Sequence, residues 1–309
     1  MQATDTCHTL AIDWGTTHRR AYALSATGHC LSEHADADGA LACKGRFPEA
    51  LTAGLQALNA TPQQVLMSGM VGSALGWQEV PYVTGDVPLT DLAKHLAEVP
   101  AAPGSPRQWI VPGYCVRDAF GQPDVMRGEE TQLLGAVTLG HASGWFVLPG
   151  THSKWVQLQD GQVRQLRTYL TGELFNLLGQ HGTLAAAIGA HAQDWDAAAF
   201  AKGVKAAANG ALSHALFGTR ARVVTSDMPA SHTKAYLSGL LIGTELHDVL
   251  RNTDPTGDTA PVKLIGSPEL AAHYEAAATL LGLRFEVLDA RAAFLSAMAF
   301  LQSQLDNSL

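Results

Sequence analysis

Residues 10–28 read LAIDWGTTHRRAYALSATG, and this stretch predicts how the first half of the chain folds. An apolar strand over residues 10–12 leads to Asp13, and a Gly15-Thr16-Thr17 turn precedes a second strand. Exposed backbone N–H groups in such a glycine turn form an anion-binding concavity. Asp13 at its mouth would repel a bare phosphate, which favours a Mg²⁺ ion between the two. The stretch therefore predicts a phosphate-binding hairpin with Asp13 as a metal ligand, although an ordinary hairpin can share the pattern.

Residues 147–161 read VLPGTHSKWVQLQDG and repeat the same order of parts. Each copy has an apolar strand, a Gly-Thr turn, a basic residue three positions after the Thr and an outgoing strand. A third strand is predicted after each hairpin, at residues 30–34 and 163–169. The predicted phosphate contacts are Gly15, Thr16 and Thr17 in the first turn and Gly150, Thr151, His152 and Lys154 in the second. For Lys154, the alternative is a strand residue that faces solvent.

The spacing of the two hairpins predicts the domain organisation. Gly150 follows Gly15 by 135 residues, which is about the length of one domain. Strands alternate with helical patterns in both halves, which indicates an α/β fold. The sequence therefore predicts two similar domains, residues 1–135 and 136–309, with a ligand cleft between them.

Composition excludes several classes of function. The chain has 309 residues, a formal net charge of -8 and only 20 Lys and Arg, which argues against a nucleic-acid surface. Its four cysteines lack the close spacing of a zinc site, so we expect reduced thiols in the cytoplasm. The sequence has no run of 18 apolar residues, so no membrane span is predicted. The sequence leaves the oligomeric state open, and a homodimer is one possibility.

Several separated segments carry a resemblance to a known family. They are IDWGTT, GMVGSALGWQEVPYV, IVPG, DVMRGEETQLLGA, LPGTHSKWV, YLTGELF, YLSGLLIG and LIGSPEL. The two hairpins and the last segment resemble the phosphate-1, phosphate-2 and adenosine motifs of the sugar kinase, heat-shock protein and actin superfamily. Within it, the chain is similar to the 2-dehydro-3-deoxygalactonokinase family.

The resemblance implies two ribonuclease-H-like domains of the actin-like ATPase type. It also implies ATP and Mg²⁺ as cofactors, with Gly266 and Ser267 at the adenosine site. The implied substrate is 2-dehydro-3-deoxy-D-galactonate, phosphorylated on its 6-hydroxyl. Three alternatives remain: a kinase for another sugar acid, an exopolyphosphatase-like phosphohydrolase, and a nucleotide-gated binding protein as in actin. The acidic net charge speaks against a channel for a polyanion.

A glycine-rich segment, residues 65–83, is the predicted sugar-acid pocket. The resemblance implies that Gly72, Ser73 and Trp77 line it, whereas a Trp packed in a loop core is the alternative. Among the cations, Arg20 is the first choice to meet the substrate carboxylate. Adjacent strand residues point to opposite faces, so only one of Arg19 and Arg20 can share the side of Asp13.

Residues 124–131 read DVMRGEET and begin a predicted helix. Acidic residues in a first helical turn suit the helix dipole, which is the simplest interpretation of Glu129 and Glu130. The resemblance implies instead that one of them is the catalytic base, with Glu129 preferred because a helix's first residue is the freer one. Arg127 is predicted to bind the carboxylate or the transferring phosphoryl group.

Overall fold

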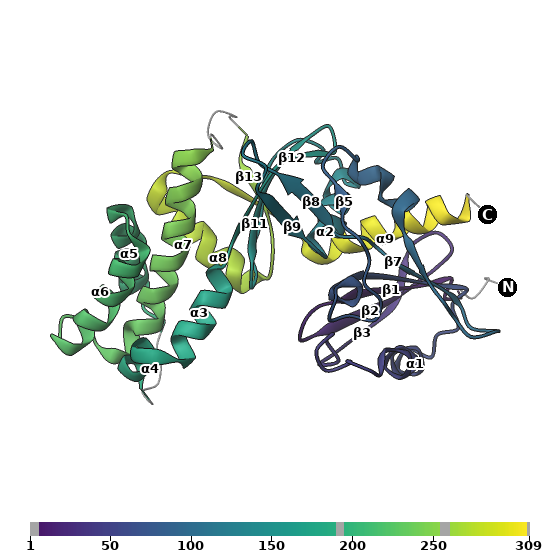
Figure 1. Ribbon diagram of the computed structural model, residues 1–309, viewed down its shortest axis with the longest axis horizontal. Coiled ribbons are helices and arrows are strands. Elements are labelled where there is room, and N and C mark those ends of the chain that lie inside the picture. Colours follow the sequence, from purple (N-terminus) through teal and green to yellow (C-terminus); the bar gives the residue numbers. More distant parts are fainter. Residues whose placement is uncertain (1–5, 190–194, 254–259, 308–309) are drawn as a thin grey trace. The chain divides into compact units, whose positions relative to one another are not determined.

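The computed structural model describes residues 6–189, 195–253 and 260–307, which form two compact units (Figure 1). Unit 1 comprises Met1–Ser143, Val156–Leu166 and Asp289–Leu309, and unit 2 comprises Gly144–Trp155 and Arg167–Leu288. The predicted division after residue 135 assigned the C-terminal helix and residues 156–166 to the second domain, whereas both belong to unit 1 here. The domain boundaries and the cleft between domains stay predictions.

Six strands form the main sheet of unit 1, in the order β3-β2-β1-β4-β7-β6. The first three strands are antiparallel to one another, whereas β4 runs parallel to β1 and β7 runs parallel to β4. The bounds are β1 (Thr9–Trp14), β2 (Arg19–Leu24), β3 (Cys30–Asp36), β4 (Gln64–Gly69), β6 (Ala97–Val99) and β7 (Arg107–Ile110). The predicted first hairpin and its third strand are confirmed.

Helices cover this sheet on both faces. Ile12 and Trp14 of β1 share one buried cluster with Phe47 of helix α1 (Phe47–Ala57). From the other face, Tyr22 of β2 contacts Phe294 of helix α9 (Ala290–Asp306), with ring centroids 5.5 Å apart. Burial on both faces explains why β1 reads as a continuous apolar run.

Unit 1 also contains a small sheet and the helix that follows it. A small sheet has the order β5-β8-β9. Helix α2 (Glu129–Thr138) follows it and packs closely on α9, since a Cβ on Gly135 would lie 1.7 Å from the carbonyl oxygen of Ala293. The bounds of the remaining elements are β5 (Val83–Thr84), β8 (Tyr114–Arg117), β9 (Pro123–Met126) and the 3-10 helices η1 (Met70–Gly72) and η2 (Leu89–His95).

A second sheet, of five strands, has the order β12-β11-β10-β13-β14, and its strands β10, β13 and β14, all of unit 2, are parallel. This arrangement repeats the order of β3-β2-β1-β4-β7 in unit 1. The bounds are β10 (Gly144–Leu148), β11 (Ser153–Gln159), β12 (Gln162–Tyr169), β13 (Val262–Ile265) and β14 (Phe285–Leu288). The predicted second hairpin and its third strand are confirmed.

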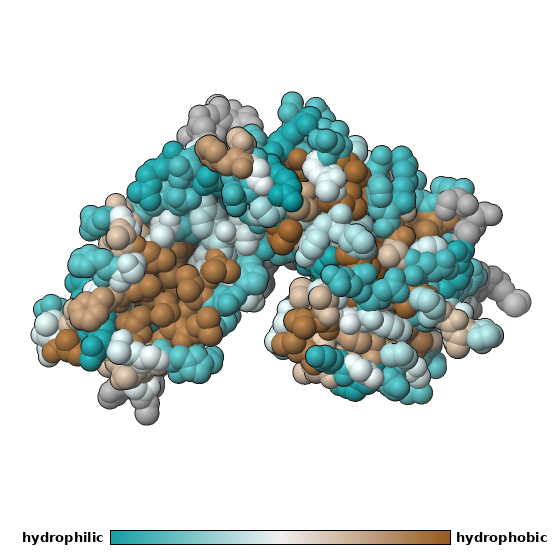
Figure 2. Space-filling model, in the orientation of Figure 1, coloured by the Kyte–Doolittle hydropathy of each residue, from teal (hydrophilic) through white to brown (hydrophobic). Residues whose placement is uncertain are grey.

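Helix α7 (Thr233–Asn252) is the central helix of unit 2 and is mostly buried. Residues 235–250 read AYLSGLLIGTELHDVL, which predicts a helix whose two glycines allow close packing, and the structure confirms this: a Cβ on Gly239 would lie 2.1 Å from the carbonyl oxygen of Phe200 in α5. The other helices are α3 (Thr171–Gln180), α4 (Gly182–Ile188), α5 (Ala197–Ala206), α6 (Leu212–Val224), α8 (Pro268–Leu281) and the 3-10 helices η3 (Ala207–Asn209) and η4 (Ala230–His232). Apolar side chains gather on the surface over these helices (Figure 2).

Two local predictions about α3 are wrong. In the sequence, Thr171 precedes the apolar residues 174–178 and is predicted to be the N-cap of their helix, but it is the first helical residue and its hydroxyl donates to Glu245. The same pattern predicts Leu177 on the buried side of the helix, whereas Leu177 is 47% exposed. Separately, among the described residues no helix combines the length and apolarity needed to cross a membrane.

Candidate active site

Asp13 lies at the carboxyl end of β1, directly opposite Arg20 on β2. Nη1 of Arg20 is 3.4 Å from Oδ2 of Asp13, and the two side chains are 60% and 27% exposed. Burial raises the pKa of Asp13 above its ordinary value, while Arg20 lowers it and the nearby charge of Glu129 raises it. The site thus holds two carboxylates close enough to repel each other, beside an exposed guanidinium.

Two glycines with positive φ bring the start of α2 to the end of β1. Gly69 ends β4 at φ 94°, and a Cβ there would lie 2.7 Å from the carbonyl oxygen of Trp14. Gly128 has φ 108°, and a Cβ there would lie 3.4 Å from the Cα of Gly69. Only glycine adopts this backbone readily at such close approach. The chain therefore places Glu129, the first residue of α2, near Asp13.

The two neighbouring glutamates have different surroundings. Glu129 is partly exposed, and one carboxylate oxygen accepts from the backbone N–H of Arg127. Glu130 is completely buried and accepts from the Gly128 N–H at 2.7 Å and from the Thr131 hydroxyl at 3.2 Å. Burial chiefly, and then the charge of Glu129, raise the pKa of Glu130 to about 8. Glu130 therefore holds the turn that presents Glu129.

Arg127 lies under the glycine-rich loop of unit 1. Its Nη2 donates to the carbonyl of Val80 at 2.7 Å, and its guanidinium stacks over the ring of Tyr82 at 4.3 Å. A Cβ on Gly72 would lie 2.9 Å from Nη1 of Arg127, so only glycine fits there without a shift. Nε and Nη1 of Arg127 are buried and lack a hydrogen-bond partner among the described residues.

The other predicted sugar-pocket residues make contacts within unit 1. Trp77 stacks on Phe47, with ring centroids 6.0 Å apart, and meets Trp14 edge-on. The hydroxyl of Ser73 donates to the carbonyl of Met70 and accepts from the N–H of Leu75. One face of Trp77 is thus covered, and a sugar-stacking role for it stays a prediction.

Two backbone hydrogen bonds hold the first Gly-Thr turn. The carbonyls of Gly15 and Thr16 accept from the backbone N–H groups of residues 40 and 41. Both threonine side chains of the turn are exposed. Their assignment as phosphate contacts stays a prediction.

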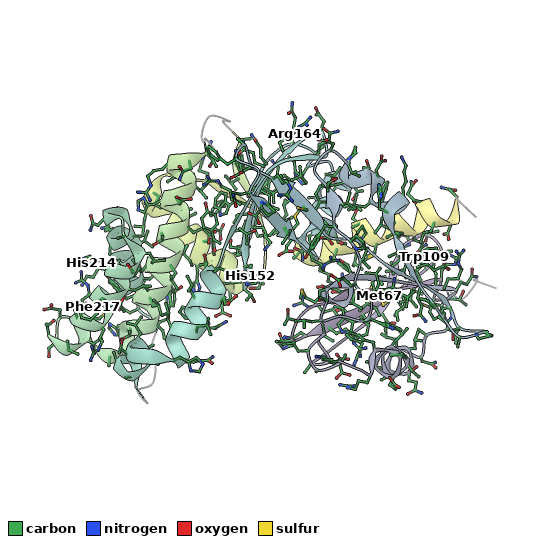
Figure 3. The ribbon with its side chains drawn as sticks, viewed as in Figure 1. Met67, Trp109, His152, Arg164, His214 and Phe217 are labelled. Carbon is green, nitrogen blue, oxygen red and sulfur yellow. The ribbon has the colours of Figure 1, made fainter. Side chains whose placement is uncertain are left out.

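The second turn packs against the start of helix α3. His152, labelled in Figure 3, is hydrogen-bonded to Glu173, whose N–H donates to the carbonyl of Thr151. A Cβ on Gly172 would lie 2.3 Å from the carbonyl oxygen of Gly150. Lys154 is only 5% exposed, and its predicted phosphate contact stays untested.

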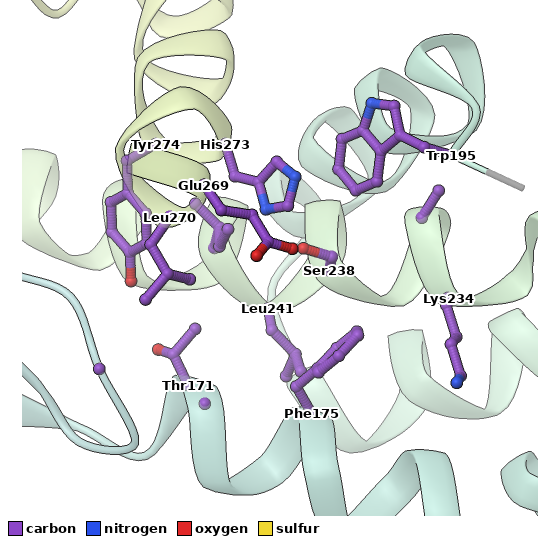
Figure 4. Close-up of a pocket in the computed structure, with 14 residues that line it drawn as sticks. Thr171, Phe175, Trp195, Lys234, Ser238, Leu241, Glu269, Leu270, His273 and Tyr274 are labelled. Atoms are coloured by element: carbon purple, nitrogen blue, oxygen red, sulfur yellow. The ribbon is translucent and has the colours of Figure 1, made fainter. Parts of the chain in front are cut away.

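Unit 2 contains a cavity of about 290 Å³ beside this turn (Figure 4). Thr171 and Tyr274 lie at one end, and Trp195 and Lys234 lie at the other. Near the second end, the rings of Trp195 and His273 are stacked with centroids 4.0 Å apart. The lining residues are Gly150, Thr171, Gly172, Phe175, Trp195, Lys234, Ala235, Ser238, Leu241, Ile242, Glu269, Leu270, His273 and Tyr274.

Sequence reasoning missed most of this lining. It selected Gly266 and Ser267, which precede α8; the Ser267 hydroxyl caps that helix, and Gly266 lies against Pro149. The cavity uses Glu269, Leu270 and His273 of the same helix instead. A usable signal was the spacing of Lys234, Ser238 and Leu241, which puts all three on one side of α7.

Comparisons with known proteins identify the class and the family. In fold, the chain is similar to (R)-2-hydroxyglutaryl-CoA dehydratase component A of Acidaminococcus fermentans, with a TM-score of 0.53 and 11% identity over 97% of this chain and 100% of that one. This likeness and the two repeated sheets define the class of the fold, which is α/β.

The model of the 2-keto-3-deoxy-galactonokinase family matches residues 13–301, and the chain belongs to this family of kinases. The 2-dehydro-3-deoxygalactonokinase of Escherichia coli (strain K12) is 36% identical, over 90% of this chain and 91% of that protein. A solved protein of Sinorhizobium meliloti, described as a candidate 2-dehydro-3-deoxygalactonokinase, has a TM-score of 0.85 and 34% identity, covering 97% and 96% of the chains. The predicted family is confirmed, and the phosphohydrolase alternative is not favoured.

Proposed function

We propose that this chain transfers the γ-phosphoryl group of ATP to the 6-hydroxyl of 2-dehydro-3-deoxy-D-galactonate. The observation that carries the proposal is the arrangement at the end of β1, in a chain of this kinase family. Two carboxylates, Asp13 and Glu129, and the exposed guanidinium of Arg20 lie together there. Phosphoryl transfer to a sugar acid needs a metal ligand, a base and a cation for the substrate carboxylate.

The nucleotide occupies the cavity of unit 2 in this proposal. Its stacked rings of Trp195 and His273 suit the face of a purine, and Gly150 at the opposite side belongs to a Gly-Thr turn of the kind that binds phosphate. A cavity of about 290 Å³ that is partly apolar, with a few polar groups such as Lys234 and Glu269, is typical of a cofactor site.

The residues at the end of β1 fit a Mg²⁺ ion. This ion usually retains several waters and needs only one or two protein carboxylates. The charge of Glu129 raises the pKa of Asp13, and a divalent cation would relieve that repulsion. When bound, Mg²⁺ would neutralise charge on the transferring phosphoryl group.

Arg20 meets the substrate carboxylate in this proposal. Its side chain is 60% exposed, so a ligand can reach the guanidinium, and Asp13 already orients it. Arg127 supports the site differently, since its Nε and Nη1 are buried. Its guanidinium lies between Val80, Tyr82 and Gly72 and fixes the glycine-rich loop of the sugar pocket.

Glu129 is the proposed base that accepts the proton of the 6-hydroxyl. It is the partly exposed glutamate, at the free end of α2, and one oxygen is held by the Arg127 N–H. Glu130 keeps the Gly128 turn in place and does not touch substrate. The repeated sheet order supports two ribonuclease-H-like domains as the scaffold for this chemistry.

One assay tests the proposed function. The protein is incubated with Mg-ATP and, separately, with the galacto- and gluco-configured 2-dehydro-3-deoxy acids, neutral hexoses, polyphosphate or no acceptor, and ADP and free phosphate are measured. We expect ADP formation, without free phosphate, to be fastest with the galacto acid. Faster turnover of another acid would change the substrate, and phosphate release from polyphosphate would contradict a kinase.

A further inference from the structure

Glu245 is a completely buried carboxylate in the middle of helix α7. Four side chains donate hydrogen bonds to it at 2.5–2.8 Å. Ser153 and Trp155 donate to Oε1, and Thr171 and Tyr274 donate to Oε2. All four donors are neutral groups, so hydrogen bonds rather than a counter-ion compensate for the burial of this carboxylate.

The four donors come from three elements, two of which, α3 and α8, line the proposed nucleotide cavity. Ser153 and Trp155 are the first and third residues of β11, directly after the second Gly-Thr turn. Thr171 begins α3, and Tyr274 belongs to α8. Thr171 and Tyr274 also line the cavity, at the end nearest the turn (Figure 4). Glu245 itself is not among the cavity-lining residues of the described chain.

The same contacts fix the turn relative to the cavity. The first turn of α3 packs on the Gly-Thr turn, because the Glu173 N–H donates to the Thr151 carbonyl and a Cβ on Gly172 would lie 2.3 Å from the carbonyl oxygen of Gly150. Glu245 holds both sides of this junction, through Ser153 on the hairpin and Thr171 on the helix. One buried acceptor thus fixes the hairpin and the helix to each other, and such supporting hydrogen bonds hold a site in its productive geometry.

We infer that Glu245 is a positioning residue for the nucleotide, which sets the distance between the Gly150–Ser153 turn and the stacked rings of Trp195 and His273 in the cavity. This inference rests on the proposed assignment of the cavity as the nucleotide site. The turn contacts phosphate and the far end of the cavity contacts the base, so the distance between them determines how well a nucleotide with phosphates fits. Adenosine alone does not depend on that distance.

The Glu245→Gln variant separates positioning from simple stability. Gln has nearly the same size but only one acceptor atom, so it cannot accept from both pairs of donors. Two of the hydroxyls must reorient, and the hairpin and α3 lose their common acceptor. We expect ADP affinity, measured by calorimetry, to fall about tenfold or more, which is about 1.4 kcal/mol, because the phosphate-binding turn is no longer fixed relative to the stacked rings.

Adenosine affinity and the KM for the sugar acid should change by less than about threefold, which is no more than the effect of losing one neutral hydrogen bond. A loss of folded protein alone would lower the apparent affinity for ADP and adenosine by the same factor. If Glu245→Gln does not fold, Ser153→Ala removes a single donor and should show the same selectivity for ADP over adenosine, with a smaller loss.

Tyr236→Phe is the matched control. It also removes a buried hydroxyl from α7, one that accepts from Arg222, but Tyr236 does not line the nucleotide cavity. ADP affinity of this control should stay within about twofold of that of the parent protein, because substitutions at sites that share no contacts have nearly independent effects. Equal losses for ADP and adenosine in the Glu245 and Ser153 variants would overturn the positioning role.

A separate variant tests the site on which the inference rests. Ser238→Trp fills the cavity and should abolish ADP binding by the folded protein. Normal ADP affinity in that variant would refute the cavity as the nucleotide site, and with it this part of the proposed function. ADP binding that Ser238→Trp abolishes but Glu245→Gln leaves unchanged would refute only the role of Glu245.

Discussion

Asp13 and Arg20 occupy paired positions in β1 and β2, with Oδ2 and Nη1 3.4 Å apart. The adjacent Arg19 has the opposite environment: it is 2% exposed and bound to Asp36 and to the carbonyl of Ala50. Strand alternation therefore separates a structural arginine from one on the side of Asp13. The pair Asp13 and Arg20 forms the centre of the proposed site in unit 1.

Replacing Asp13 by Asn should nearly abolish turnover while the fold persists. The neutral amide cannot organise Mg²⁺, and we expect kcat to fall by about 100-fold or more, or roughly 3 kcal/mol of barrier at ~1.4 kcal/mol per tenfold. Because burial raises the pKa of Asp13, the neutral residue should not lower the melting temperature. Near-normal kcat in the folded variant would rule out the metal role.

Glu129→Gln should lower kcat much more than it raises the KM for the sugar acid. A general base acts in the transition state, and its loss costs roughly 10²- to 10⁴-fold in rate. Glu130→Gln is the matched neighbour, and steady-state kinetics should show a far smaller loss of kcat for it. The reverse pattern would make Glu130 the base, and two small effects would leave the segment as a helix start only.

The fold was largely predictable because its signals are local. Each hairpin combines an apolar strand, a Gly-Thr turn and a second strand within about 20 residues, and such patterns specify local structure directly. The helix over α7 and its close packing at Gly239 followed from the same kind of signal. Thr171 was misread because a buried partner 74 residues away, Glu245, competes with the capping role that its position in the sequence suggests.

The candidate site was predictable only in part. Asp13, Arg20 and Glu129 were selected by motif and by resemblance, but their proximity depends on Gly69 and Gly128 meeting across distant segments. The cavity residues Trp195 and His273 come from two segments with no shared pattern. Such tertiary contacts leave no periodic signal in one sequence, so the cavity proposed to bind the nucleotide had to come from the structure.

Glu130 should make the folded state less stable as the pH rises. Its pKa is raised from 4.5 to about 8 in the folded protein, so the folded state holds a proton that the unfolded state releases. Stability from this group is complete below pH 4.5 and is lost as the pH rises through about 8. Melting temperatures of the parent protein should fall relative to Glu130→Gln between pH 4.5 and about 8, because the amide does not titrate. Parallel curves for the two proteins would contradict this prediction.

Arg20→Ala should weaken use of the sugar acid specifically. A guanidinium contact to a carboxylate is worth about 1.5–3 kcal/mol, so kcat/KM for the acid should fall roughly 10- to 100-fold, with the KM for ATP nearly unchanged.

Arg127→Gln should instead lower the melting temperature and slow phosphorylation of every acceptor, since Arg127 holds Val80 and Tyr82 and is buried at Nε and Nη1. Arg291→Ala is the control, because Arg291 is similarly exposed at 51% and pairs with Glu33 instead. Kinetics with the acid and with a neutral hexose distinguish the two arginines: only the one that contacts the carboxylate should reduce the preference for the acid when it is removed. If Arg20→Ala keeps that preference and Arg127→Gln loses it, the carboxylate contact belongs to Arg127.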